Sequence, residues 1–159
     1  MILAFATACG GGDPSSPSLR ATVVRADLDT IRFEVPAATL RCSDGKAVLL
    51  QGADERGSGV LTRLRYHDSL VAGAFPLIAL GDSITPRGAN VAVRYMKGDI
   101  AHGVSLDSGV VDLTAAGDVL AARVRGTGLE AGQRIGVDAT YAGVRRPPPG
   151  DTVPCGYAR

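Results

Sequence analysis

The stretch SGVVDLTAAGDVLAARVRG, residues 108–126, decides the fold class. Apolar side chains alternate with polar ones on both sides of its central AAGD segment, so that Val111 and Leu113 face the same way as Leu120 and Val124. A period of two is typical of a β-strand with one buried face, and AAGD contains residues that favour a tight turn. The stretch therefore predicts an antiparallel β-hairpin.

The same period recurs along the chain, in TIRFEV (30–35), GVLTRLRYHD (59–68), NVAVRYM (90–96) and QRIGVDATYAGV (133–144). Turn-forming segments such as SDGK and ADERGSG separate these runs at fairly regular intervals, and no window of a dozen residues has the spacing of an amphipathic helix. We therefore expect an all-β protein. The preferred architecture is an antiparallel β-sandwich, Ig-like or similar, of eight or nine strands, and the alternative is a closed β-barrel.

Composition limits the classes of partner. The chain has 159 residues, a formal net charge of +1, no Trp and only seven other aromatic residues. Its basic residues are spread along the whole length, whereas nucleic-acid binding requires clustered basic groups and usually exposed aromatic rings. The length fits one folded domain, which we place at residues 19–159.

The N-terminus carries a processing pattern. Residues 1–9, MILAFATAC, form a short apolar run that ends in Ala-Thr-Ala-Cys, and residues 10–18, GGGDPSSPS, form a Gly/Ser/Pro spacer. The run resembles the end of a bacterial lipoprotein signal peptide with its lipobox. The resemblance implies that Cys9 is acylated and becomes the new N-terminus, with residues 10–18 as a tether. The alternative is a frayed or core-packed apolar N-terminus.

Two further expectations follow from this resemblance. No Lys or Arg precedes the apolar run, so we expect translation to start further upstream. Lipid on Cys9 makes a membrane the expected partner and the bacterial cell envelope the expected location. Gly10 is not the Asp that favours inner-membrane retention in lipoproteins, so the resemblance favours the outer membrane or its periplasmic face in an organism with two membranes.

The two remaining cysteines form an even pair. With Cys9 assigned to lipid, Cys42 and Cys155 are left in a chain that matures in an oxidising compartment, where disulfides persist. We predict a disulfide between them, and two separate buried thiols are the alternative. A metal site is not expected, because His67 and His102 have no ligand spacing relative to these cysteines or to each other.

One block resembles an enzyme family. The stretch FPLIALGDSITPRGANVAVRY, residues 75–95, contains Gly-Asp-Ser, and the segment DIAH follows at residues 99–102. These blocks resemble those of the SGNH (GDSL-type) hydrolases. The resemblance implies Ser83 as nucleophile, His102 as general base and Asp99 as the residue that orients it.

Other observations favour a turn over a catalytic site at this block. The Gly-x-Asn-Asp block that helps to bind the oxyanion in that family is absent, since the single Asn of the chain, Asn90, precedes Val91. A strand-like segment follows the Gly-Asp-Ser block where the family has a helix. Gly, Asp and Ser are also common turn residues. We therefore expect a turn between two strands and keep a surface-tethered serine esterase as the alternative function.

Two arginine pairs have two interpretations. Arg63/Arg65 and Arg123/Arg125 each lie on one face of a predicted strand, either as a patch for an anion or lipid headgroup or as solubilising charge.

Taken together, these patterns predict a lipoprotein with a non-catalytic binding or structural β-domain and no cofactor. Its ligand is a protein, a glycan or an apolar molecule.

Overall fold

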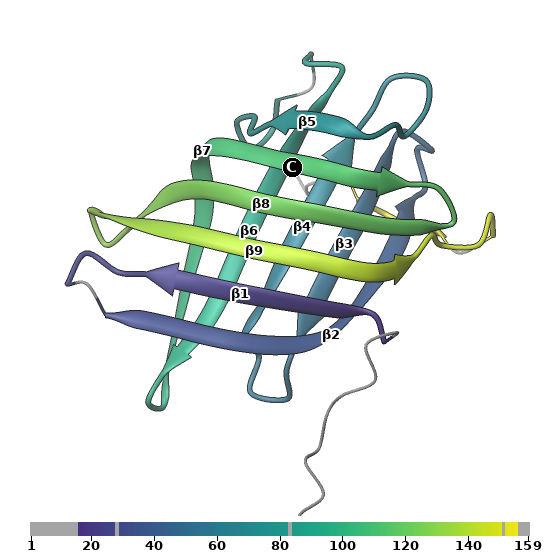
Figure 1. Ribbon diagram of the computed structural model, residues 1–159. Helices are drawn as coiled ribbons and strands as arrows, with labels where there is room; N and C mark the ends of the chain where they lie inside the picture. Colours follow the sequence, from purple (N-terminus) through teal and green to yellow (C-terminus); the bar gives the residue numbers. More distant parts are fainter. Residues whose placement is uncertain (1–15, 28, 83, 151, 156–159) are drawn as a thin grey trace, which may run out of the picture.

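The computed structural model describes residues 16–27, 29–82, 84–150 and 152–155 (Figure 1). These residues form ten β-strands: β1 (Ser18–Val24), β2 (Thr30–Cys42), β3 (Ala47–Ala53), β4 (Gly59–Arg65), β5 (Gly73–Pro76), β6 (Gly88–Lys97), β7 (Ile100–Ala116), β8 (Val119–Glu130), β9 (Gln133–Arg145) and β10 (Thr152–Val153). The described residues include no helix that is long and apolar enough to cross a membrane.

Eight of these strands form a closed antiparallel barrel. Their order is β1-β9-β8-β7-β6-β4-β3-β2, and β2 pairs in turn with β1, from Ser18 opposite Pro36 to Val24 opposite Thr30. The expected all-β antiparallel fold is confirmed. It takes the form of the alternative, the closed barrel, because the pairing of β1 with β2 leaves no free edge between the first and last strands of the sheet.

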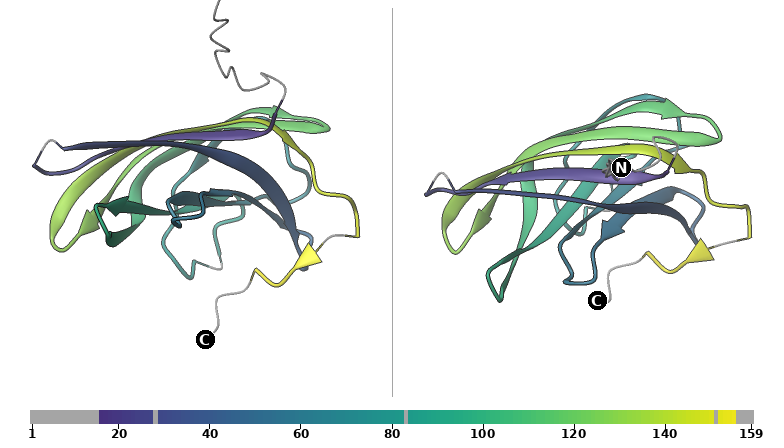
Figure 2. Two further views of the ribbon diagram at one scale, coloured as in Figure 1. Left: turned by 90° about the horizontal axis from the view of Figure 1, so that it is seen from below. Right: turned by 60° about the horizontal axis from the view of Figure 1, so that its bottom comes forward.

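The barrel is flattened into two layers, which explains why its sequence resembles that of a sandwich (Figure 2). Two long strands belong to both layers. Residues 18–24 of β1 pair with the first half of β2, whereas residues 37–41 of β2 pair with β3. Similarly, β7 pairs with β6 up to Ser105 and with β8 from Leu106 onward. Such bent strands form the corners of the barrel.

Glycine permits the sharp bend in β7, where this strand changes its partner from β6 to β8. The register shifts between Leu106 and Ser108, and Gly109 follows with φ of 134°. A Cβ atom on Gly109 would lie 2.2 Å from the carbonyl oxygen of Arg125, and one on Gly128 would lie 2.4 Å from that of Ser105. Only glycine allows the two backbones to approach this closely.

The interior is filled with side chains. Alternate residues of each strand point inward, as predicted for the hairpin, where Val111 faces Val124 and Leu113 faces Ala122. The largest fully buried side chains are Tyr95, Tyr141, Phe75, Leu19, Leu50, Leu64, Leu113, Leu120 and Ile135. An eight-stranded barrel is just wide enough for its side chains to fill, so the lumen is a packed core.

One tyrosine crosses this core. The hydroxyl of Tyr141, on β9, lies 3.2 Å from the carbonyl oxygen of Leu50 and 2.9 Å from that of Val60 in the opposite layer. The hydroxyl of Thr62 lies 3.3 Å away. Burial raises the pKa of Tyr141 well above its usual value, so the neutral phenol is the form that joins the two layers.

The predicted disulfide is present. Cys42 at the end of β2 is bonded to Cys155, with the two Cα atoms 5.3 Å apart. β10 pairs in parallel with the end of β2, and Ser43 donates its backbone N–H to the carbonyl of Val153 at 2.9 Å. The disulfide and these backbone bonds together hold the C-terminal segment against the barrel.

Replacing both Cys42 and Cys155 with Ser is expected to lower the free energy of unfolding by about 2–5 kcal/mol, because the bond closes a loop of more than a hundred residues in the unfolded chain. Urea denaturation followed by circular dichroism measures this loss. The wild-type protein in reducing agent should match the double variant. An identical urea midpoint for the oxidised wild type and the double variant would contradict the prediction.

Candidate functional site

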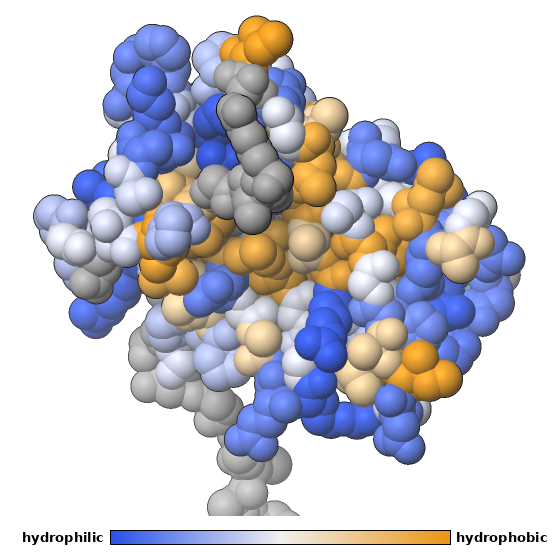
Figure 3. All heavy atoms as spheres, turned by 180° about the vertical axis from the view of Figure 1, so that it is seen from behind, coloured by the Kyte–Doolittle hydropathy of each residue, from blue (hydrophilic) through white to orange (hydrophobic). Residues whose placement is uncertain are grey.

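An apolar groove lies on the outer face of strands β3, β4 and β6. Outward-facing residues of adjacent strands stand in rows, with Gln51, Leu61 and Ala92 opposite one another. Leu61 is 42% exposed, which is a high value for a large apolar side chain in the middle of a strand. Figure 3 shows an apolar band across this face, between hydrophilic regions.

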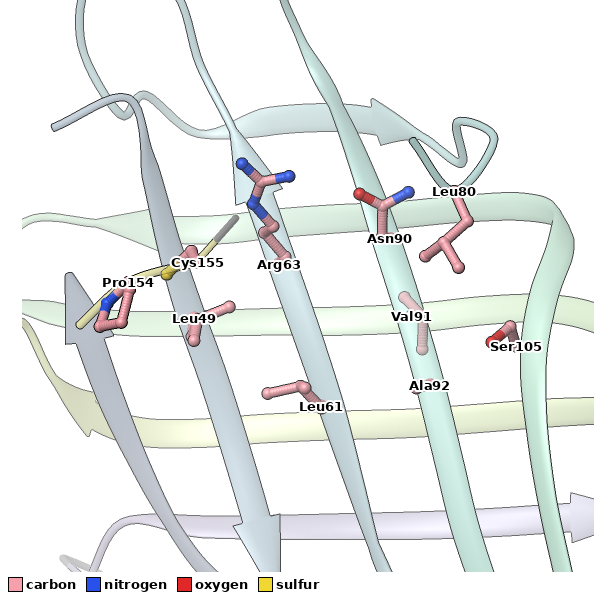
Figure 4. Close-up of a pocket in the computed structure, with 10 residues that line it drawn as sticks. All are labelled: Leu49, Leu61, Arg63, Leu80, Asn90, Val91, Ala92, Ser105, Pro154 and Cys155. Carbon is pink, nitrogen blue, oxygen red and sulfur yellow. The ribbon is translucent and has the colours of Figure 1, made fainter. Parts of the chain in front are cut away.

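Two segments from distant parts of the sequence form the walls of the groove (Figure 4). Leu80, in the loop between β5 and β6, lies on one side, and Pro154 and Cys155 lie on the other. The groove has a volume of about 250 Å³. Its lining residues are Leu49, Leu61, Arg63, Leu80, Asn90, Val91, Ala92, Ser105, Pro154 and Cys155.

Specific bonds fix both walls. The disulfide fixes the wall formed by Cys155. On the other side, the side-chain amide of Asn90 donates to the carbonyl of Ile78 at 2.8 Å, two residues before Leu80. The groove is therefore pre-formed, which reduces the entropy that a ligand loses on binding.

The loop that carries Leu80 is held by a charged residue as well. The carboxylate of Asp82 accepts hydrogen bonds from the Thr85 hydroxyl at 2.6 Å and from the backbone N–H groups of Thr85 and Ile84, both at 2.8 Å. These bonds lower the pKa of Asp82 to about 2. Arg65 on β4 donates to the carbonyls of Asp82 and Thr85. The loop is thus tied to the outer face of β4.

Two further hollows adjoin the groove along β4. One, of about 480 Å³, shares Leu61 with the groove and is otherwise lined by Pro36, Ala37, Ala38, Gln51, Gly52, Ala53, Gly59 and Val60. The other, of about 420 Å³, shares Arg63 with the groove and is otherwise lined by Asp44, Lys46, Arg65, Tyr66, His67, Ile84, Thr85 and Pro86. The outer face of β4 therefore runs from an apolar hollow through the groove to a polar one.

The residues of the predicted esterase site lie in two places. Ser83 is outside the described residues, but its neighbours Asp82 and Ile84 belong to the loop held by Arg65. Arg65 is opposite Gly88 at the start of β6, whereas His102 is opposite Tyr95 near its end. Seven residues of strand separate these positions, which corresponds to roughly 23 Å.

His102 instead belongs to a polar cluster at one end of the barrel. Its Nδ1 lies 2.9 Å from Oε1 of Glu130, and its ring stacks on that of Tyr95 with centroids 5.1 Å apart. The Tyr95 hydroxyl donates to Oε2 of Glu130 at 2.6 Å and accepts from Arg25 at 3.1 Å. Asp99 lies in the turn between β6 and β7, outside this set of contacts.

A carboxylate bonded to Nδ1 orients an imidazole as it does in hydrolase triads. Here, however, the four side chains pack on one another where the turns β1–β2, β6–β7 and β8–β9 meet. The side chains of Arg25, His102 and Glu130 are only 15–22% exposed. The cluster lies at this end of the barrel, and the bonds among its side chains compensate for most of the cost of burying them, although Nε of Arg25 is buried without a hydrogen-bond partner.

Burial and the hydrogen bond to Glu130 raise the pKa of Tyr95 to about 12. In the unfolded chain the phenol has its ordinary pKa of about 10. The contribution of Tyr95 to stability is therefore complete below pH 10 and is lost as the pH rises through 12.

We expect an ultraviolet titration to show a tyrosinate step near pH 12 that disappears in Tyr95→Phe. We also expect the variant to lose less stability than the wild type between pH 10 and 12. A wild-type titration in which Tyr95 ionises at its ordinary pKa would show that the phenol is not bonded to Glu130 in solution. Glu130→Gln is the matched variant, and it should lower the pKa of Tyr95.

Sequence reasoning did not find the groove. One signal was present, since Leu61 lies on the face of GVLTRLRYHD that otherwise carries Arg63, Arg65 and His67. Leu80 and Pro154 could not be connected with Leu61, because their position depends on the loop and on the disulfide.

No protein family, curated protein sequence or solved structure matches this chain. Cys9, the predicted lipid site, lies outside the described residues.

Proposed function

We propose that this protein is an exported, lipid-anchored binding protein and that its ligand places an apolar segment in the groove over β3, β4 and β6. The observation that carries the proposal is the groove itself. It is an exposed apolar surface on a protein whose interior is already filled, and both of its walls are fixed by bonds.

The packed lumen is the reason to place the ligand outside the barrel. Many barrels bind small molecules within the lumen, but here Tyr95, Tyr141 and Phe75 are fully buried in it. The Arg25/Tyr95/His102/Glu130 cluster also lies at one end. An apolar ligand therefore meets pre-formed apolar surface on the outer face, where Leu61 and Leu80 are 42% and 64% exposed.

The N-terminal pattern supports the anchored location. Lipid on Cys9 would hold the domain by the tether of residues 10–18, and nine residues span at most about 30 Å. The domain would therefore stay close to the surface of the membrane. The Cys42–Cys155 disulfide is consistent with an oxidising compartment outside the cytoplasm.

Expression in bacteria from the gene with its upstream region tests the anchor. We expect radiolabelled palmitate to appear in the wild-type protein and to be absent from Cys9→Ser, because only the thiol of Cys9 accepts the diacylglyceryl group. Cys42→Ser/Cys155→Ser is the control and should keep the label. Equal labelling of wild type and Cys9→Ser would show that the lipid is not on Cys9.

A neutral, environment-sensitive fluorophore such as N-phenyl-1-naphthylamine tests the groove. We expect its emission to rise on binding to the wild type and to fall at least several-fold in Leu61→Gln, because burying a leucine side chain against a ligand contributes about 1.5–3 kcal/mol. Leu129→Gln is the matched control, since Leu129 is 52% exposed and does not line the groove. The proposal is wrong if both variants bind the fluorophore as the wild type does.

A further inference from the structure

The two outer faces of the flattened barrel differ in chemistry (Figure 2). The groove face is the outer surface of β3, β4 and β6, and the opposite face is the outer surface of β1, β8 and β9. Salt bridges join neighbouring strands on the opposite face, between Arg20 and Glu34 at 2.9 Å, Arg123 and Asp138 at 2.6 Å, and Arg125 and Asp112 at 2.7 Å. The opposite face is therefore suited to contact with water.

Large apolar side chains are exposed at different places on the two faces. In the strands of the opposite face, those among the described residues lie at strand ends, with Val24 last in β1, Val119 first in β8 and Leu129 next to last in β8. On the groove face, Leu61 is exposed within the middle part of β4. The apolar band of Figure 3 lies across this face.

The neighbours of Leu61 explain why it stays exposed. Gln51 of β3 and Ala92 of β6 are directly opposite it, and Ala38 and Ser105 follow at the two ends of the same row. None of these four side chains is both large and apolar, so none can cover Leu61 with apolar surface. The apolar contact that Leu61 lacks has to come from outside the barrel.

The loop of residues 77–87 adds two exposed apolar side chains beside the groove. Leu80 is 64% exposed and Ile84 is 91% exposed. The backbone that carries them is fixed, because the Asp82 carboxylate accepts from the N–H of Ile84 at 2.8 Å and Arg65 donates to the carbonyl of Thr85 at 2.8 Å. The loop therefore presents its apolar side chains with little further loss of entropy on binding.

The point where the tether meets the barrel lies at the rim of the groove face. The carbonyl of Pro17 accepts from the backbone N–H of Ala37 at 3.1 Å, and Ala37 lines the apolar hollow that shares Leu61 with the groove. The tether of residues 10–18 spans at most about 30 Å. Packed sheets are only about 10 Å apart, so either outer face can reach a membrane that holds Cys9. The chemistry of the two faces then selects the groove face.

Tethering favours the bilayer over a partner in solution. A domain on a short tether meets the membrane surface at a high effective concentration, so a small apolar contact is enough to keep it docked. A stable complex with a soluble protein buries about 800 Å² on each partner. Three exposed side chains, Leu61, Leu80 and Ile84, suit the smaller contact.

We infer that the groove face rests on the lipid bilayer that carries the anchor. Leu80 and Ile84 enter the surface region of the bilayer, an acyl chain enters the groove beside Leu61, and the ion-paired opposite face remains in water. This inference rests on the proposed function, because it names lipid acyl chains as the apolar segment that occupies the groove. It also assigns a role to Ile84, which does not line the groove.

A single introduced tryptophan tests the inference, because the chain has no Trp of its own. Ile84→Trp places the probe on the groove face. Thr140→Trp is the matched control, since Thr140 is exposed on the opposite face, between Arg20 and Arg123.

The lipidated proteins are reconstituted into vesicles of dioleoylphosphatidylcholine, or of phosphatidylcholine with brominated acyl chains. Bromine quenches tryptophan on contact, so we expect several-fold stronger quenching in Ile84→Trp than in Thr140→Trp. The emission of Ile84→Trp should also lie at shorter wavelength than that of the control.

Second substitutions in the Ile84→Trp protein test the groove itself. Leu61→Gln and Leu80→Gln should each reduce the quenching several-fold, because each removes apolar surface that docking buries. Leu129→Gln is the control and should leave the quenching unchanged, since Leu129 is exposed away from the groove. Leu80→Gln keeps the test decisive if Leu61→Gln folds poorly. Added salt should have no effect, because screening acts on charges.

Each contrary outcome has a distinct meaning. Equal quenching of Ile84→Trp and Thr140→Trp, or loss of quenching in salt, overturns the inference. Binding of the neutral fluorophore without bromine quenching overturns the inference and leaves the proposed groove intact. Failure of both overturns both proposals. A wild-type chain that takes up no palmitate overturns the anchor, and this inference with it, and leaves the groove to the fluorophore test.

Two other occupants of the groove face are covered by the same series. If bromine does not quench Ile84→Trp and Leu61→Gln converts a dimer into a monomer in sedimentation velocity, the face is an interface with a second copy. If bromine quenches Ile84→Trp only in a chain that ends at Cys155, the occupant is the segment 156–159. Either result overturns the inference.

Discussion

The pairing of β1 with β2 is the constraint on which the rest of the structure depends. Seven residue pairs, from Ser18/Pro36 to Val24/Thr30, join the two ends of an eight-strand order and convert a sheet into a barrel. Closure removes the free edges through which sheets aggregate. It also sets the diameter, and at eight strands the lumen is filled by side chains such as Tyr141, whose hydroxyl links the two layers. A closed and filled barrel leaves only its outer face for recognition.

Much of this fold was predictable, because alternation of apolar and polar residues is a local property. The hairpin at residues 108–126 and the shared inward face of Val111, Leu113, Leu120 and Val124 were correctly predicted from period two alone. The turn after Leu80 was correctly predicted from its turn residues. The closed barrel was only the alternative prediction, because the sequence does not show where a strand changes partners. Closure requires β2 and β7 each to pair with a strand of one layer along its first part and with a strand of the other layer along the rest. The bend at Gly109 depends on the nearby carbonyl of Arg125, and sequence spacing does not reveal that contact.

The groove was harder to predict than the fold for a related reason. Its floor comes from adjacent strands, but Leu80 and Pro154 come from segments more than seventy residues apart. Their convergence depends on Asn90, on the Asp82 turn and on the disulfide. By contrast, the Gly-Asp-Ser block and DIAH lie close together in the sequence but at opposite ends of β6. Proximity in sequence was therefore misleading for the predicted esterase site, whose residues lie at opposite ends of β6. It was uninformative for the groove, whose walls come from distant parts of the sequence.

The position of Cys155 in the wall of the groove has a consequence for when the site comes into being. Without the disulfide, the contacts that hold this wall among the described residues are the short pairing of β10 with β2 and a few backbone bonds. In the proposed exported protein, the covalent bond would form after the chain reaches an oxidising compartment. A binding surface completed at that step is not ready to capture apolar molecules at the place of synthesis. In the proposed exported binding protein, oxidation would thus set the order of events, with translocation first and loading of the ligand second.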